Sequence, residues 1–170
     1  IPRRLNVTDL LDDKPALRNK VKAGTPLGRE TGTDDKTVRD RLRMLAGIDE
    51  GVQQLFASLE SIGQLDRTVI VFASDHGYWN GEHGLSIERR LAYEEAIRIP
   101  LLVRYPPLLR AGIVIDEMAL SIDLAPTMLD LAGAESEERM DGRSLVPLLA
   151  GDRPDNWRTS FLIEYYSDIV

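Results

Sequence analysis

The sequence predicts an α/β domain in which a mixed sheet is flanked by helices, and three observations support this class. A long segment with helical periodicity precedes a short, continuously apolar run of the kind that forms a strand covered on both faces. A second apolar run comes after a loop, and short helical segments come after it. Of the 170 residues, 43% are hydrophobic and 29% are charged, which is typical of a globular chain.

The first predicted element is a long helix. Residues 1–34 are rich in charge, proline and glycine, so we expect an irregular lead-in before a domain at residues 35–170. Apolar residues then recur at spacings of three and four, which places them on one helical face. These residues are Val38, Leu42, Leu45, Ile48, Val52, Leu55, Leu59 and Ile62. Gly63 is expected to end the helix, because glycine tolerates the left-handed backbone of a C-cap.

Three strands are predicted, at residues 68–73, 99–105 and 161–165. The first is apolar throughout, and the second carries Pro100 near its start, where proline is tolerated. Short helices are expected near residues 91–96 and at residues 123–131, with a further turn at 144–149. Asp123 is the expected N-cap of the helix at 123–131, because its carboxylate can accept an orphan amide hydrogen.

Charge and composition exclude several classes of function. The chain has 28 acidic and 21 basic residues and a net charge of -7, so we expect no nucleic-acid or anionic-membrane partner. No apolar stretch approaches the roughly 20 residues of a membrane span. The chain has no cysteine, and therefore no disulfide and no thiolate nucleophile. The compartment and the oligomeric state are left open.

Asp75 and His76 directly follow the first predicted strand, and Gly77 comes next. Open α/β sheets bind their ligands at the carboxyl ends of strands, and a carboxylate with an imidazole can bind one divalent cation. Asp and Gly are also common where a strand simply turns, so the pair alone does not decide between a site and a turn. The motifs around it carry more information.

The chain from Ser74 onward resembles the second metal-site segment of the sulfatases, which belong to the alkaline-phosphatase superfamily. The matching motifs are Ser-Asp-His-Gly at 74–77, Gly-Glu-His-Gly at 81–84, Arg89, Tyr-Glu-Glu at 93–95 and Arg-Ile-Pro-Leu-Leu-Val at 98–103. Residues 123–133 and 141–149 also resemble the segments downstream of this site in bacterial members. The resemblance extends from about residue 35 to the end, and it implies that the chain is the C-terminal part of a larger catalytic domain.

The resemblance implies roles for individual residues. Asp75 and His76 would be ligands of a hard divalent cation, calcium or magnesium, and Arg89 would stabilise the sulfate oxygens as a catalytic residue. Arg89 stands where the family usually has a lysine, and a guanidinium cannot release a proton at ordinary pH. His83 and Arg90 would contact substrate, although a histidine in such a loop also often serves only as a hydrogen-bonding residue.

Glu94 and Glu95 are expected to be structural, capping the adjacent helix or pairing with Arg98.

The nucleophile that the family uses does not occur in this chain. It is a formylglycine made from the cysteine of a Cys-x-Pro-x-Arg string, and a related branch uses serine or threonine instead. Neither string occurs in the 170 residues. The chain begins at Ile1 without an initiator methionine, so we expect the nucleophile and the first metal-binding aspartate pair upstream. We therefore expect this chain to be inactive by itself.

These features support three functional hypotheses. The first is that the parent protein is a sulfate-ester hydrolase acting on a small-molecule or carbohydrate sulfate ester through a metal-bound formylglycine hydrate. The second is a phosphonate or phosphate ester hydrolase of the same superfamily, which would share Asp75 and His76. The third is a non-catalytic fragment or interaction module in which the metal site is vestigial.

Overall fold

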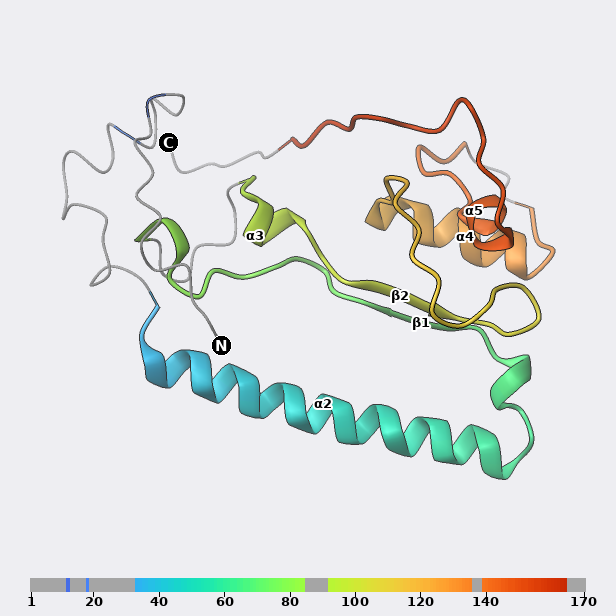
Figure 1. Ribbon diagram of the computed structural model, residues 1–170, viewed down its shortest axis with the longest axis horizontal. Helices are drawn as coiled ribbons and strands as arrows, with labels where there is room; N and C mark the ends of the chain where they lie inside the picture. The colour runs from blue at the N-terminus through green and yellow to red at the C-terminus, as the bar shows by residue number, and fades with distance from the viewer. Residues whose placement is uncertain (1–11, 13–17, 19–32, 85–91, 136–138, 165–170) are drawn as a thin grey trace. The chain divides into compact units, whose positions relative to one another are not determined.

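The computed structural model describes residues 33–84, 92–135 and 139–164, together with Asp12 and Arg18 (Figure 1). The chain divides into two compact units. Unit 1 comprises Ile1–Ser61 and His76–Pro100, and unit 2 comprises Ile62–Asp75 and Leu101–Val170. One of the peptide bonds that connect them therefore joins Asp75 to His76.

Unit 1 contains the predicted long helix, α2, at Asp35–Ser61. Asp34 caps its start, because its carboxylate accepts the Thr37 amide hydrogen at 2.9 Å and the Thr37 hydroxyl at 2.6 Å. Gly63 follows its end with φ 65°, the left-handed conformation expected of a C-cap glycine. The helix is confirmed, but no residue along α2 is buried. Its apolar stripe is half-buried at Val38, Val52 and Leu59 and exposed at its other positions.

The other well-described part of unit 1, residues 76–84 and 92–100, contains a loop and a short helix around Trp79. The predicted helix near 91–96 is α3, Glu94–Ile97, and a 3-10 turn, η2, occupies Glu82–Gly84. Trp79 is fully buried and meets the ring of Tyr93 edge-on, with 5.5 Å between ring centroids. An edge-to-face aromatic pair of this kind is a favourable contact. The aromatic pair thereby fixes the loop against the residue that precedes α3.

Unit 2 contains both of the first two predicted strands, β1 at Ile70–Ala73 and β2 at Leu101–Arg104. They pair antiparallel, with Phe72 opposite Leu102. We expected β1 to be covered on both faces, and this is wrong for the described residues. Phe72 and Leu102 share one face and are 40% and 61% exposed. The described helices of unit 2 leave that face uncovered.

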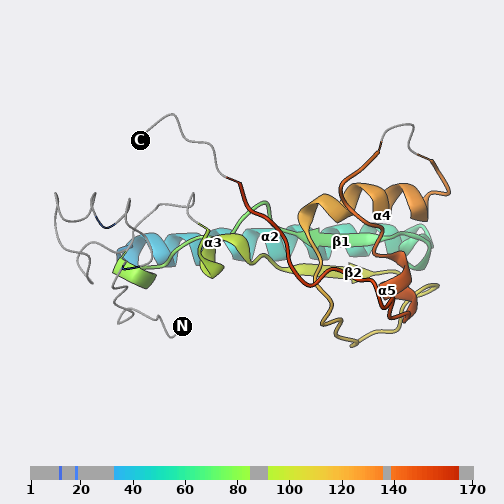
Figure 2. The same cartoon turned by 90° about the horizontal axis from the view of Figure 1, so that it is seen from above.

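The other face of the sheet carries the core of unit 2. The helices of this unit are α4, Leu124–Leu131, and α5, Val146–Ala150 (Figure 2), which confirm the predicted helix at 123–131 and the turn at 144–149. Leu145, Leu148 and Leu149 are buried and pack against β2. An apolar hollow of about 450 Å³ lies between the strands and α4. Two further 3-10 turns, η1 at Leu65–Arg67 and η3 at Ser121–Asp123, complete the unit.

The third predicted strand is wrong over residues 161–164, which are not in a strand. Phe161, Leu162 and Ile163 are each at least 40% exposed. A strand persists only where a neighbour pairs with its amides and carbonyls, and no described segment does so here. Tyr165, the last residue of that prediction, lies outside the described residues.

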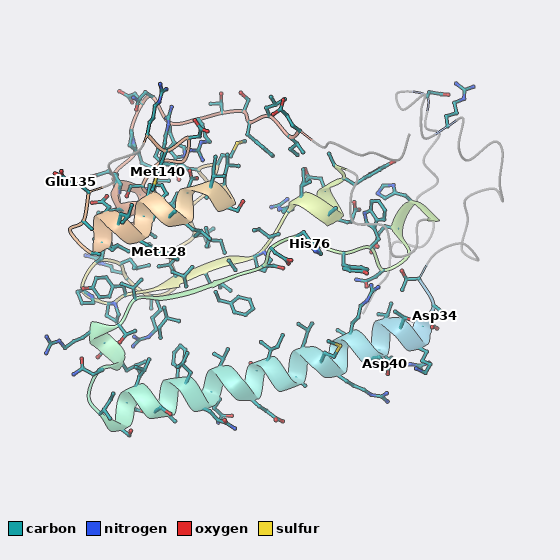
Figure 3. The ribbon with its side chains drawn as sticks, turned by 180° about the vertical axis from the view of Figure 1, so that it is seen from behind. Asp34, Asp40, His76, Met128, Glu135 and Met140 are labelled. Carbon is teal, nitrogen blue, oxygen red and sulfur yellow. The ribbon has the colours of Figure 1, made fainter. Side chains whose placement is uncertain are left out.

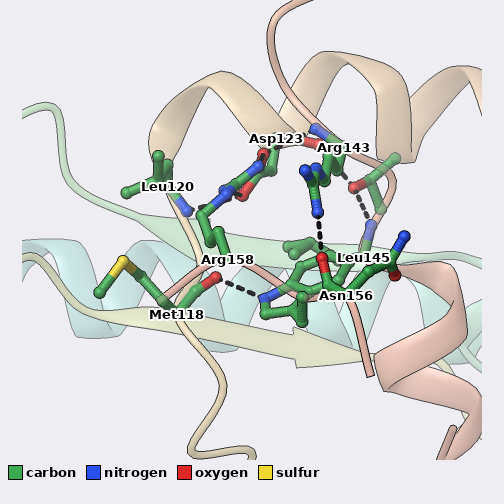
Figure 4. Close-up of polar contacts among 9 residues, drawn as sticks. Met118, Leu120, Asp123, Arg143, Leu145, Asn156 and Arg158 are labelled. Atoms are coloured by element: carbon green, nitrogen blue, oxygen red, sulfur yellow. Dashed lines mark hydrogen bonds and ion pairs between the residues drawn. The ribbon is translucent and has the colours of Figure 1, made fainter. Parts of the chain in front are cut away.

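The carboxylate of Asp123 holds several segments of unit 2 together (Figure 4). Asp123 is fully buried and occupies the predicted N-cap position of α4, but its carboxylate makes no hydrogen bond to the amides of that helix. Its carboxylate accepts the amide hydrogens of Leu120 and Arg143, each at 2.8 Å. Arg158 pairs with both carboxylate oxygens through its two terminal nitrogens, in the forked geometry of a strong ion pair. The side chain thus binds residues 20 and 35 positions away in the sequence.

The backbone of Asp123 extends this network. Thr127 donates its hydroxyl to the Asp123 carbonyl at 2.6 Å and accepts the Leu145 amide hydrogen at 2.9 Å. Glycine is required at position 142, next to this network, because a Cβ there would lie 2.0 Å from the carbonyl oxygen of Ile122. One buried carboxylate therefore sets the distance between α4 and the segment that leads into α5.

Replacing Arg158 should destabilise unit 2 strongly. In Arg158→Ala the Asp123 carboxylate stays buried without its cation, which costs about 3–5 kcal/mol of unfolding free energy in comparable buried pairs. Urea unfolding of the full-length protein measures the change. Lys36→Ala is the control, because the Lys36–Asp40 pair is exposed and surface pairs contribute little to stability. Equal, small effects of the two substitutions would contradict this assignment.

The same carboxylate should make stability fall in acid. Burial raises the pKa of Asp123, but the hydrogen bonds from Arg158 and from the amides of Arg143 and Leu120 outweigh it, so its pKa lies below the ordinary 3.8. A lowered folded pKa means that the stabilisation is complete above the unfolded pKa and is lost as pH falls through the folded pKa. The unfolding free-energy difference between wild type and Asp123→Asn should therefore shrink as pH drops from about 6 to about 2.5. A free-energy difference that stays constant over this pH range would contradict the predicted contribution of the ionised Asp123 carboxylate.

Candidate functional site

Asp75 and His76 leave the end of β1 as predicted. β1 ends at Ala73; Asp75 is an exposed residue, and His76, labelled in Figure 3, is half-buried. The Ser74 hydroxyl lies 3.4 Å from the Asp75 carboxylate, which is a weak hydrogen bond.

The ring of His76 is held in one tautomer. Its Nδ1 lies 2.7 Å from the carbonyl oxygen of Gly77, and a carbonyl can only accept, so Nδ1 carries the proton. The neutral ring then has its lone pair on Nε2. Metal-binding histidines are commonly held in this way, with one ring nitrogen donating to a backbone carbonyl and the other facing the ion. The ring chemistry of His76 fits a metal ligand.

Gly77 brings the backbone of the site loop against α3. Its amide donates to the carbonyl oxygen of Ala96 at 2.7 Å. A Cβ at this position would lie 2.0 Å from the carbonyl oxygen of Glu95, which no real side chain tolerates. Only glycine allows the residue that accepts from His76 to sit this close to α3.

Arg41 of α2 holds the next residues of the loop. Its Nη1 donates to the carbonyl oxygen of Trp79 at 3.0 Å and to the side chain of Asn80 at 3.2 Å. Its guanidinium also lies over the ring of Tyr78, 3.8 Å from the centroid, in a cation–π contact. Thr33 adds a hydroxyl donor to the same Trp79 carbonyl at 3.1 Å. Sequence reasoning missed Arg41, because nothing local distinguishes it from other arginines of that helix.

His83 has a backbone conformation that is rare for a residue with a side chain, φ 59° and ψ 12°. Its Nε2 lies 3.2 Å from the Glu95 carboxylate, and the two side chains are 14% and 26% exposed. The ring also packs on Tyr93, with centroids 4.5 Å apart. We expected Glu94 and Glu95 to cap α3 or pair with Arg98. Glu94 does pair with Arg98, at 3.8 Å, whereas Glu95 contacts His83.

Arg89 and Arg90 lie outside the described residues, which omit 85–91. Across residues 33–84, 92–135 and 139–164, no three His, Cys, Asp or Glu side chains lie close enough to hold a metal ion together. Asp75 and His76 can therefore supply only part of a coordination sphere from this segment. Within the same ranges, no helix is long and apolar enough to cross a membrane.

Comparison with known proteins places the chain in a family. The family model of N-sulphoglucosamine sulphohydrolase, C-terminal, matches residues 81–168, just over half of the chain. An N-acetylglucosamine-6-O-sulfatase of Bacteroides thetaiotaomicron is 41% identical over 131 residues, 76% of this chain and 23% of the relative. The human N-acetylglucosamine-6-sulfatase is 38% identical over 135 residues, 79% of this chain and 24% of the relative. The chain belongs to the sulfatase family, and it spans about a quarter of these relatives.

Solved structures agree with this assignment. BT4656, determined in complex with its substrate D-glucosamine-2-N,6-O-disulfate, is similar with a TM-score of 0.70 and 39% identity, covering 74% of this chain and 26% of that one. A phosphonate monoester hydrolase from Silicibacter pomeroyi is similar with a TM-score of 0.61 and 39% identity, covering 65% of this chain and 22% of that one. The fold is thus that of a sulfatase α/β domain, of which this chain is a part.

Replacing Gly77 should displace the loop that contains it. In Gly77→Ala the added Cβ meets the Glu95 carbonyl, so the loop must shift and the hydrogen bond to Ala96 is lost. We expect a loss of about 1–3 kcal/mol in unfolding free energy, as for overpacked sites. Urea unfolding of the full-length protein measures it. Gly51→Ala is the control, because nothing lies within 4 Å of its Cβ.

Proposed function

We propose that the parent protein is a sulfate-ester hydrolase that acts on a sulfated amino sugar, and that this chain contributes part of its divalent-cation site. The observation that carries the proposal is the 41% identity, over 76% of the chain, to an N-acetylglucosamine-6-O-sulfatase. The similar structure of BT4656 with a doubly sulfated glucosamine supports the same class of substrate.

The proposed cation is calcium or magnesium, held by the Asp75 carboxylate and by Nε2 of His76. The exposed position of Asp75 and the donation from His76 Nδ1 to Gly77 support this pairing. When bound, the cation would act as a Lewis acid on the negative charge of the sulfate group. Because hard divalent ions take six or more ligands, the other ligands would come from the remainder of the parent protein.

Arg89 would hold the sulfate oxygens as a fixed planar cation, and Arg90 and His83 would contact the substrate. The attacking group would be a formylglycine hydrate from another part of the parent protein, since this chain contains no string that could form it. In this arrangement the 170 residues alone bind the cation weakly and do not turn over substrate. Within the described loop, Arg41 binds the Trp79 carbonyl and the Gly77 amide binds the Ala96 carbonyl.

A phosphonate monoester hydrolase is the second candidate, because one such enzyme is 39% identical with a TM-score of 0.61. The two classes need the same cation and differ in the central atom that is attacked. Hydrolysis assays of the full-length protein on N-acetylglucosamine 6-sulfate and on an aryl phosphonate monoester separate them. We expect the larger kcat/KM on the sulfate, and a preference for the phosphonate would overturn the proposal.

Loss of the Asp75 carboxylate should abolish turnover while the fold survives. In Asp75→Asn the amide oxygen carries no negative charge, so the cation is held less tightly and kcat/KM should fall at least about a hundredfold. Excess calcium or magnesium should restore part of the activity, and chelation should inactivate wild type reversibly. Steady-state assays over a metal titration measure both effects.

Asp116→Asn is the matched control, because Asp116 is another exposed aspartate of this chain. Its kcat/KM and its metal dependence should equal those of wild type. An Asp75→Asn enzyme with unchanged activity at limiting metal would contradict the assignment of the ligand.

A further inference from the structure

Arg41 is the residue of α2 that reaches the loop after the proposed cation ligands. It is half-buried, and its Nη1 donates to the carbonyl oxygen of Trp79 at 3.0 Å and to the side chain of Asn80 at 3.2 Å. Thr33, which is buried, donates its hydroxyl to the same carbonyl at 3.1 Å. Two side chains from the start of α2 and the residues before it therefore hold the loop backbone at Trp79.

Tyr78 connects this anchor to His76. The guanidinium of Arg41 lies over the Tyr78 ring, 3.8 Å from its centroid, which is a cation–π contact. The rings of Tyr78 and His76 have centroids 6.2 Å apart and are tilted by 43°. Ring pairs at this separation are within the range of favourable aromatic contact. Tyr78 thus contacts both the cation of Arg41 and the imidazole whose Nε2 is the proposed ligand atom.

The backbone on either side of Tyr78 is held by other contacts. The Gly77 amide donates to the carbonyl oxygen of Ala96 at 2.7 Å, and the side chain of Trp79 is fully buried. Tyr78 itself is half-buried, so its ring could turn toward solvent by rotation about χ1 if nothing lay on its face. The guanidinium of Arg41 therefore adds the placement of this ring, which the backbone contacts do not set.

We propose that Arg41 is a positioning residue for the divalent-cation site, acting on the His76 ring through the ring of Tyr78. This inference rests on the proposed function, which supplies the cation, and deepens it by adding a residue of α2 to the site. The lone pair of a ligand must point at the ion, and the residues behind the ligands orient it. Arginine suits this role better than lysine, because its planar guanidinium can cover an aromatic face and donate hydrogen bonds at once.

Calorimetric titration of the metal-free full-length protein with calcium chloride, and separately with magnesium chloride, measures cation affinity without substrate. In Arg41→Ala the dissociation constant should rise about tenfold, as is usual when a residue behind a metal ligand is removed. Tyr78→Leu should show a similar rise, whereas Tyr78→Phe should stay within about twofold of wild type, because it keeps the ring. Arg43→Ala is the matched control and should bind like wild type, because Arg43 of the same helix pairs with Asp40 on the surface.

The double variant tests whether Arg41 acts through Tyr78. Two residues that act through one shared contact have non-additive effects on the free energy of binding. Arg41→Ala combined with Tyr78→Leu should therefore bind the cation within about twofold of Arg41→Ala alone. Effects of the two substitutions that multiply would overturn the route through Tyr78.

Urea unfolding of the same variants separates positioning from stability. An Arg41→Ala protein that loses stability but binds the cation as wild type does would overturn the inference and leave the proposed function standing. If Arg41→Ala does not fold, the two Tyr78 variants decide, since equal affinities of Tyr78→Leu and Tyr78→Phe would contradict a role of the ring. A wild-type protein that binds neither cation would overturn the proposed cation site, and the inference with it.

Discussion

The buried carboxylate of Asp123 is the interaction on which unit 2 depends. It is desolvated, so it is stable there only because Arg158 and two backbone amides neutralise and saturate it. Losing one partner costs about 3–5 kcal/mol, a large share of the roughly 5–15 kcal/mol by which a domain is stable. Among the described residues of unit 2, the buried apolar side chains are Leu145, Leu148 and Leu149. The Asp123 network adds contacts between distant segments that these leucines do not make.

Most secondary structure could be predicted from local pattern, whereas the Asp123 network could not. The period of α2, the apolar runs of β1 and β2 and the start of α4 are signals within a few residues. Asp123 was predicted as an N-cap, which is its position, but its partners lie 20 and 35 residues away. The strand predicted at 161–165 failed for a related reason. Residues 161–164 have strand-like composition, and pairing depends on a neighbour that local pattern does not reveal.

The candidate site shows the same division between local and distant signals. The sequence alone indicates Asp75 and His76 as candidates because they are adjacent and follow a strand, and the resemblance to sulfatases implies the proposed roles of Arg89 and Arg90. Arg41 and Glu95 were not identified as site residues, because arginine and glutamate on helices are usually solvated. Their partners are 38 and 12 residues distant. The structure adds the contacts that orient the ligand loop within unit 1.

The proposed roles constrain where a proton for the departing alcohol could come from. Arg89 cannot release one at ordinary pH. His76 keeps its proton on Nδ1, where it is donated to the carbonyl oxygen of Gly77. In the proposed mechanism Asp75 and His76 bind the cation and Arg89 binds the sulfate oxygens, so neither Arg89 nor His76 protonates the leaving oxygen.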